Sequence, residues 1–390
     1  MAINISSQAP GVYVNEVAAG VQLIQGVGTS TPAFIAPIEG QGGLRLIRSW
    51  HEFEHAFIPA EGDGEESASM TSRALPSSFL PEVVLGYFAN GGGPCYVVGV
   101  DASADDAVAA YQAVLDELAC VSDVEIVVAP DMWASDHGTA IAKLLAGHCA
   151  QMGDRMALLH TPQGLDAQQA EALPAQFDLT DDEKKFATVY FPWVRVPGSD
   201  GGESRNVPPP GHVAGVWCRV DGMRGVHKSP ANEAVQQVLG SERDISDDEQ
   251  APLNEVGVNC LRVFPRRGTL VWGARTLSQE TDWRYLNVRR AVNYLQESIE
   301  LGTSWAIFEP NNDKTWEIIR GSVANFLTDQ WRRGALLGHT PDQAFWVVCD
   351  KSNNPPDSVA AGELVIDVGV APLRPSEFIN FRVTQVFGNI

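Results

Sequence analysis

The chain has 390 residues, which is enough for two domains or for one large domain with an insertion. Hydrophobic residues make up 44% of it, so it can bury a core, but no stretch reaches the roughly 18 apolar residues of a membrane-spanning helix. The net charge of -22 argues against DNA or RNA binding, because an acidic surface repels a polyanion.

The charge is unevenly distributed. Residues 1–250 carry 13 Lys+Arg and 34 Asp+Glu (net -21), whereas residues 251–390 carry 14 and 15 (net -1). We expect the acidic part to face solvent and the balanced part to pack between partners. The six cysteines are widely spaced without a Cys-x-x-Cys, and residues 1–8 lack the basic and apolar regions of a secretory signal. These features predict reduced thiols and folding in the cytoplasm.

The N-terminal end holds an extended segment without an obvious strand partner. After a turn at Pro10-Gly11, Val12 and Val14 alternate with Tyr13 and Asn15. The backbone groups of an isolated strand must find partners elsewhere, so this segment predicts pairing outside its own chain.

From about residue 25 to 250 the pattern is α/β. Apolar runs predict strands, and amphipathic stretches between some of them predict helices. The expected strands are 33–38, 95–100, 124–129, 156–160 and 187–193, and the clearest helices are 105–120 and 138–152. Buried strands alternating with helices indicate a mostly parallel sheet covered on both faces.

The pattern changes after residue 251. Residues 258–264 and 269–272 predict a hairpin around Pro265-Arg266-Arg267-Gly268, followed by helices over about 282–301 and 314–334 and strands over 344–349 and 363–370. The chain ends, as it begins, with an alternating segment that predicts a strand without a partner: Phe378, Ile379, Asn380, Phe381, Arg382 and Val383.

One motif suggests metal chemistry. His51, Glu52 and His55 satisfy H-E-x-x-H, which on a long helix binds zinc through the two histidines with the Glu as base. Pro59 and the glycines after it end any helix within about two turns, and no histidine follows until His137. A short helix from Ser49 that packs Phe53 and Phe57 is therefore the favoured interpretation.

Two other patterns have ordinary structural explanations. The glycine run at 89–94 follows a helix and precedes a strand, the reverse of a phosphate-binding loop, so it predicts a helix end and a turn. The acidic runs 181–183 and 247–249 predict solvated helix starts rather than metal sites. No Gly-x-Ser-x-Gly elbow is present, so the sequence offers no credible active site, and we expect no enzymatic activity and no cofactor.

Several short segments together resemble the phage tail sheath family. Individually they are brief, but they follow the family's order over most of the chain: residues 10–13, 88–98, 214–215, 229–232, 257–262, 268–277, 283–290, 308–311, 334–336, 371–372 and 375–378. The resemblance implies a structural subunit that stacks as sixfold rings around an inner tube and contracts, without nucleotide, from a metastable extended state.

The resemblance also implies a domain layout. It suggests an N-terminal arm (1–24), an outer α/β domain (25–250), an inner, tube-facing domain (251–375) and a C-terminal arm (376–390), the inner domain including the N-terminal arm. The arms would add strands to the sheets of neighbouring subunits, through Val12 to Asn15 at one end and Phe378 to Val383 at the other. Arg289, Arg290 and Glu297 are candidates for contact with the tube.

The implied partners are further copies of the chain, an inner tube protein, and baseplate and terminal cap proteins, with no membrane insertion. Assembly would take place in the cytoplasm, before the particle is released. Two alternatives stay open: a zinc metallohydrolase using His51, Glu52 and His55, and a sheath-like paralogue at the baseplate or the sheath end. The sequence does not distinguish a phage tail from a tail-like bacteriocin or an extracellular injection machine.

Overall fold

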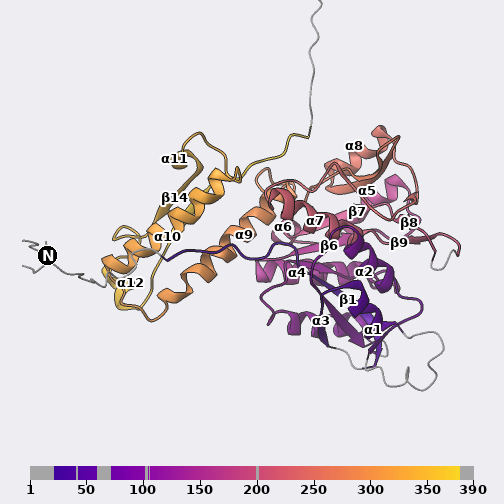
Figure 1. Cartoon of the computed structure of the whole chain (residues 1–390), viewed down its shortest axis with the longest axis horizontal. Helices are drawn as coiled ribbons and strands as arrows, with labels where there is room; N and C mark the ends of the chain where they lie inside the picture. The colour runs from indigo at the N-terminus through magenta and orange to yellow at the C-terminus, as the bar shows by residue number, and fades with distance from the viewer. Residues whose placement is uncertain are drawn as a thin grey trace, which may run out of the picture. The chain divides into compact units, whose positions relative to one another are not determined.

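The structure is a computed structural model that describes residues 22–40, 43–58, 72–101, 104, 106–198 and 202–377. The chain divides into two compact units (Figure 1). Of the described residues, the larger unit takes 26–297, 335–337 and 372–377, and the smaller unit takes 22–25, 298–334 and 338–371. Among the described residues, no helix is both long and apolar enough to cross a bilayer.

The larger unit contains most of the regular structure. Its strands are β1 (Pro32–Gly40), β2 (Leu44–Ile47), β3 (Ser72–Ala74), β4 (Cys95–Asp101), β5 (Ile126–Val128), β6 (Met156–His160), β7 (Ala187–Phe191), β8 (Val194–Val196), β9 (Arg205–Val207), β10 (Glu233–Ala234), β11 (Gly240–Ser241), β12 (Val258–Phe264) and β13 (Gly268–Val271). Its helices are α1 (Trp50–Phe57), α2 (Leu80–Ala89), α3 (Ala107–Leu118), α4 (Gly138–Met152), α5 (Ala167–Gln176), α6 (Asp181–Lys185), α7 (Pro210–Arg224), α8 (Asp247–Glu255) and the first part of α9 (Leu286–Thr303).

The smaller unit is mainly helical. It contains the end of α9, the 3-10 helix η4 (Ser304–Ala306), α10 (Asp313–Arg332), α11 (Pro341–Ala344), β14 (Phe345–Val348), α12 (Pro356–Ala360) and β15 (Asp367–Val370). Strands β14 and β15 form an antiparallel pair that packs against α10.

The core of the larger unit is a parallel sheet. Strands β4, β1, β5, β6, β7 and β12 lie side by side in that order and all run parallel. Antiparallel strands extend both sides: β2 beside β4 forms one edge, and β13 beside β12 is followed by β10 at the other edge. Their apolar runs are continuous because both faces are covered (Figure 1). In β1, for example, Ala33 and Ile35 belong to one core, and Phe34 and Ala36 to the other. The predicted α/β fold is confirmed.

Helices α2 and α7 on one face of this sheet cross in very close contact. A Cβ atom at Gly211 would lie 1.9 Å from the carbonyl oxygen of Val83, and one at Gly215 would lie 2.4 Å from that of Tyr87. The glycines therefore allow the two helix backbones to touch. A larger side chain at either position would fit only if one of the backbones moved.

We expect Gly211→Ala to destabilise the protein by about 1–3 kcal/mol, because the added methyl group overpacks the helix crossing. Gly222→Ala is the matched control on the same helix: nothing lies within 4 Å of its Cβ position, so this change should stabilise the protein by up to about 1 kcal/mol. Urea unfolding of both variants checks the prediction, which is wrong if the two substitutions have the same effect.

The division of the structure does not coincide with the expected domain boundary at residue 250. Strand β12 pairs in parallel with β7, and β13 follows as its hairpin partner, so residues 258–271 continue the large sheet. The larger unit therefore extends to Glu297, within α9. The change in charge at residue 251 therefore does not coincide with a boundary between the two units.

Helix α9 also begins four residues later than the expected start at Asp282. The backbone of Arg284 accepts a hydrogen bond from Thr276 at 2.9 Å, and Leu286 donates to Ala274 at 3.1 Å. This pairing holds residues 284–286 in a bridge, so helical structure begins with Leu286.

Candidate functional site

Parallel α/β sheets usually bind ligands at the carboxyl ends of the strands, where the strand order reverses. Here the order reverses between β1 and β5, and β5 leads to Asp131. The Asp131 carboxylate accepts a hydrogen bond from the Ser78 hydroxyl at 2.5 Å and one from the Phe79 amide at 2.8 Å. Burial raises the pKa of Asp131. This carboxylate holds the loop before α2.

Aromatic side chains fill the neighbouring strand ends. The indole of Trp133 donates to the His160 carbonyl at 2.8 Å, and the indole of Trp193 donates to the Thr161 carbonyl at 2.7 Å. The His160 ring is fully buried, within 3.0 Å of the Thr161 carbonyl and 3.4 Å of the Ala129 carbonyl. The polar atoms of these three rings therefore contact backbone carbonyls at the strand ends. In an enzyme of this fold, polar groups at this edge of the sheet would contact the substrate.

Buried histidines predict acid sensitivity. Burial lowers the pKa of His160, His212 and His148 to about 4 from an ordinary value of 6.5. Protonation is then easier in the unfolded chain, so stability is lost as the pH falls from about 6.5 toward 4. Burial raises the pKa of Glu125 and Asp131, so these two carboxyl groups bind protons more tightly in the folded chain than in the unfolded chain. Their protonation at lower pH therefore adds to the free energy of unfolding.

Between pH 7 and pH 5 the fully buried His160 and His212 should each cost about 2 kcal/mol of unfolding free energy, and the half-buried His148 should cost less, because solvent screens its charge. Urea unfolding at the two pH values measures this loss. His160→Gln should reduce the pH dependence by about one histidine's share relative to the unmodified chain. An equal pH dependence in the two proteins would contradict the assignment.

The H-E-x-x-H motif forms the short helix that was expected. Helix α1 is capped by Ser49, whose hydroxyl accepts from the Glu52 amide at 3.2 Å, and its buried residues include Phe53 and Phe57. His51 and His55 are exposed. Across the part of the chain that the structure describes, no cluster of three or more His, Cys, Asp or Glu could hold a metal ion. The geometry does not support the metallohydrolase alternative.

The remaining sequence motifs are structural as well. The glycine run ends α2 and leads into β4. Asn90 holds it in place, because its side chain donates to the Gly86 carbonyl at 2.8 Å and accepts from the Gln236 amide at 2.7 Å. The two acidic runs are the first turns of α6 and α8, where Thr180 and Ser246 form capping boxes. These predictions are confirmed.

The structure contradicts the expectation that Arg289 and Arg290 face a tube, because only 6% and 3% of their surfaces are exposed. The Arg290 guanidinium pairs with Asp221 at 2.6 Å, donates to the Thr29 carbonyl at 2.8 Å and lies over the ring of Trp217. These contacts fix the first part of α9 within the larger unit, so Arg290 is a buried structural residue.

Arg289 has a comparable role. Its Nε atom donates to the Asn293 side chain at 2.6 Å, and its guanidinium lies 4.3 Å from the ring centre of Trp283 and 4.8 Å from that of Phe186. Burial lowers its pKa to about 10. Glu297 is half-buried, and a tube contact through Glu297 stays a prediction.

Residues 373–377, which include the first residues of the C-terminal arm (376–390), are held on the larger unit. Arg275 is 7% exposed; its Nε atom donates to the Glu377 carboxylate at 2.9 Å, and a second guanidinium nitrogen pairs with the same carboxylate. The Glu377 carboxylate raises the pKa of Arg275. Asn287 donates to the Leu373 carbonyl at 3.0 Å, and Arg374 pairs with Asp282 at 2.6 Å.

Sequence reasoning did not find these contacts. Glu377 and Arg275 are 102 positions apart, and a charged side chain gives no sequence signal of its partner at that distance. The nearest available signal is Arg275 itself, a charged residue directly after an apolar strand and turn. The predicted arm residues Val12 to Asn15 and Phe378 to Val383 lie outside the described residues.

The smaller unit contains a strand pair with open edges. Among the described residues, β14 and β15 pair only with each other, in the register Trp346 to Gly369 and Val347 to Val368. Residues 22–25 lie in the same unit, where the Gln22 amide donates to the Ser322 hydroxyl of α10 at 3.1 Å. Gln22 therefore lies beside α10, the helix against which the strand pair packs.

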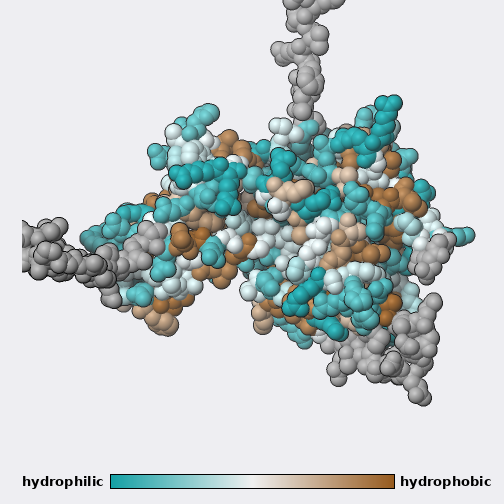
Figure 2. All heavy atoms as spheres, in the orientation of Figure 1, coloured by the Kyte–Doolittle hydropathy of each residue, from teal (hydrophilic) through white to brown (hydrophobic). Residues whose placement is uncertain are grey.

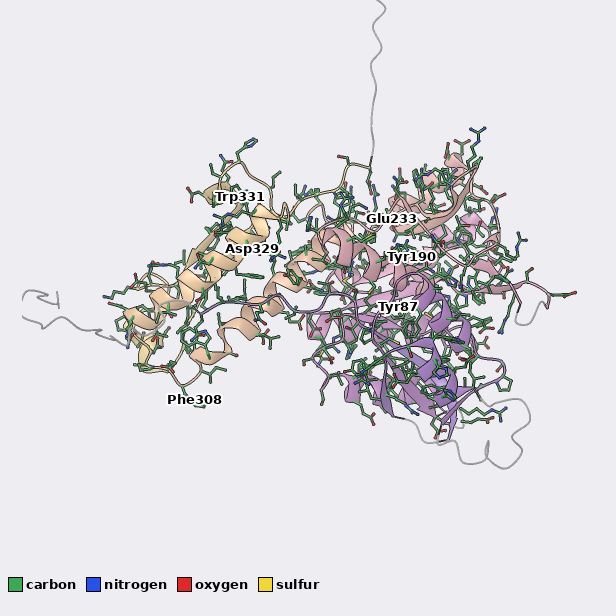
Figure 3. The ribbon with its side chains drawn as sticks, in the orientation of Figure 1. Tyr87, Tyr190, Glu233, Phe308, Asp329 and Trp331 are labelled. Atoms are coloured by element: carbon green, nitrogen blue, oxygen red, sulfur yellow. The ribbon has the colours of Figure 1, made fainter. Side chains whose placement is uncertain are left out.

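Apolar side chains are exposed at the end of α9 and in the turn that follows it. Phe308 is fully exposed and adopts a left-handed backbone conformation with φ 69°, and Ile307 and Leu301 are 66% and 55% exposed. Figure 3 labels Phe308 at the lower end of this unit, where Figure 2 shows hydrophobic surface. An exposed apolar group on a strained backbone indicates a surface that contacts a partner.

Comparison with known proteins gives one consistent result. The phage tail sheath central domain matches residues 102–277, and the phage tail sheath C-terminal domain matches residues 278–385. The sheath of an extracellular contractile injection system (PVC), solved in the contracted state, is 30% identical; the match has a TM-score of 0.77 and covers 97% of this chain and 98% of that one. The contracted helical sheath of the anti-feeding prophage is 29% identical, with a TM-score of 0.78 and coverages of 97% and 99%.

The tail sheath protein of Vibrio phage KVP40 is 28% identical over 188 residues, which are 47% of this chain and 27% of the phage protein. Other curated tail sheath relatives are matched over 28% to 49% of their lengths. The chain thus spans about a quarter to a half of these relatives.

The fold and its family matches define a structural protein of contractile tails and tail-like particles. The chain belongs to the phage tail sheath family, and the resemblance stated from the sequence is confirmed.

Proposed function

We propose that the chain is a sheath subunit that polymerises as stacked sixfold rings around an inner tube. On this proposal the sheath contracts from a metastable extended state, which drives the tube through a target envelope. The similarity to two sheaths solved in the contracted state supports this role. The same similarity supports a tail or tail-like particle as the location. Assembly in the cytoplasm before that step is part of the proposal.

The open edges of β14 and β15 carry the proposal. A two-stranded sheet is marginal by itself, and unpaired edges are templates for a further strand. The chain has alternating segments near both ends, so neighbouring copies can supply such strands. About five backbone hydrogen bonds at about 1 kcal/mol each would give about 5 kcal/mol per added arm.

A proline in the strand pair tests strand addition directly. The Ala371 amide donates to the Ala344 carbonyl at 2.8 Å, so by the alternation of an antiparallel pair the amides of Val347 and Val368 point away from the partner strand. Val347→Pro and Val368→Pro each remove one outward donor and keep the inner hydrogen bonds.

We expect both proline variants to remain folded monomers and to lose most polymer in a sedimentation assay. Val347→Ala and Val368→Ala are the matched controls, because they shorten the same side chains and keep the amides. Normal polymer in a proline variant would show that no strand is added at that edge.

The layer assignment remains part of the proposal. The acidic surface of residues 25–250 suits a solvent-facing outer layer, and the smaller unit with its exposed Phe308 suits an inner layer in contact with neighbours and the tube. Baseplate and terminal cap proteins would be the partners at the sheath ends.

A sheath-like paralogue at the baseplate is the second candidate. One similar chain belongs to the anti-feeding prophage baseplate; it is 28% identical, with a TM-score of 0.77, and the match covers 98% of this chain and all of that one. Incorporation at one end of a sheath only, without long tubes from the purified chain, would favour this role.

A further inference from the structure

Two exposed histidines, His51 and His55, lie one helical turn apart on α1, and the proposed assembly does not use them. Residues four apart on a helix project from the same face. The other six histidines do not form such a pair: His148, His160, His212 and His227 are buried or half-buried, and His137 and His339 are exposed.

The opposite face of α1 fixes the helix in place. Phe53 is fully buried and stacks against Trp50 and Phe57, with ring centres 5.3 and 5.1 Å away. Because that face is packed and Ser49 caps the first turn, the backbone positions of His51 and His55 are set before any ligand arrives.

The two imidazole rings lie close enough together to share one metal ion. Their centres are 4.3 Å apart and their planes are inclined by 81°. Two imidazoles that bind one ion at about 2.1 Å, with an angle of about 90° between the two metal–nitrogen bonds, have ring centres about 4.5 Å apart, and that bond angle is typical of Ni²⁺ and Cu²⁺. We propose that His51 and His55 form a bidentate surface site for a divalent transition-metal ion such as Ni²⁺ or Cu²⁺.

The site is a binding site and not a catalytic one. Glu52 occupies the position that the catalytic base has in a zinc protease, but here it contacts Arg48. Its carboxylate accepts a hydrogen bond from the Arg48 amide at 2.9 Å and lies 3.9 Å from the Arg48 guanidinium. The protein supplies two ligands, and water fills the remaining positions. The acidic surface of residues 1–250 favours cations near the site.

Calorimetric titration of the untagged full-length chain with NiCl₂ tests the site. We expect one Ni²⁺ per chain, and we expect His51→Ala and His55→Ala each to weaken binding at least about tenfold. His339→Ala removes a single exposed histidine and Cys120→Ser removes the exposed thiol, and both should bind Ni²⁺ like the unmodified chain.

Copper gives an independent measurement. The electron paramagnetic resonance spectrum of the Cu²⁺ complex should show coupling to two imidazole nitrogens in the unmodified chain and to one in His55→Ala. Ni²⁺ binding that is unchanged by both histidine substitutions, or a Cu²⁺ spectrum without imidazole coupling, would overturn the proposal. Neither measurement depends on polymer formation, so the test is separate from that of the sheath role.

Discussion

Deleting residues 1–20, or the C-terminal arm after Glu377, should abolish sheath formation and leave folded monomers. Each arm is expected to contribute about 5 kcal/mol to contact with a neighbour, which corresponds to a several-thousand-fold change in each association constant. Because every subunit in a polymer repeats the same contact, the loss multiplies along the sheath. Sedimentation of the two truncated chains at the concentration that polymerises the full chain measures the effect.

The structure decides where the C-terminal truncation should begin. Glu377 is held by Arg275 inside the larger unit, so a deletion that includes Glu377 would also leave a buried guanidinium without its carboxylate. Deletion of 378–390 keeps that pair and removes Phe378 to Val383. Urea unfolding of the soluble chain is the control for folding. If either truncated chain still forms normal sheaths, arm exchange at that terminus is wrong.

Asp221→Ala should destabilise the larger unit by about 3–5 kcal/mol, because it leaves the buried Arg290 charge without its partner. The two side chains are 4% and 3% exposed and 2.6 Å apart, and Asp221 also accepts a hydrogen bond from the Thr29 hydroxyl at 2.7 Å. The midpoint of urea unfolding at pH 7 measures the loss.

Two further variants show whether burial is the cause. The exposed pair of Lys143 and Asp178 has the same 2.6 Å separation, so Lys143→Met should cost at most about 1 kcal/mol. The double variant Asp221→Ala/Arg290→Met removes the uncompensated charge and should recover part of the stability lost in Asp221→Ala. Equal losses from the buried and exposed pairs would contradict this account of α9.

The sequence predicted the elements that have strong local signals. Strand β6 and helix α4 have the expected bounds, 156–160 and 138–152. Strand β6 is a continuous apolar run with both faces buried, and α4 ends at Gly153, which adopts a left-handed conformation with φ 76°. The hairpin of β12 and β13 was also predicted, with β12 at its expected bounds and β13 one residue earlier than expected, because its turn residues lie between two apolar runs.

Long-range pairing was not predictable in the same way. Charged residues at helical spacing look alike whether they face solvent or form a buried pair, so Arg289 and Arg290 suggested a surface. The partner of Arg290, Asp221, is 69 positions away on α7, and nothing local to either residue indicates it. The boundary between the two compact units, at Glu297, also differs from the expected boundary at residue 250, because the pairing of β12 with β7 joins segments far apart in the sequence.

The H-E-x-x-H motif shows how local context constrains an interpretation. Pro59 and the following glycines indicated a short helix, and α1 ends at Phe57, within two turns of His51. The geometry leaves the two histidines side by side, but it places Glu52 beside Arg48 and away from a catalytic position.

Negative-stain electron microscopy of the purified chain at high concentration tests the central claim most directly. The account predicts hollow tubes with a wide lumen and a cogwheel cross-section, formed by the unmodified chain and absent from both arm truncations. Dispersed monomers of the unmodified chain, even when the inner tube protein is supplied as a template, would contradict the claim that this chain assembles into a sheath.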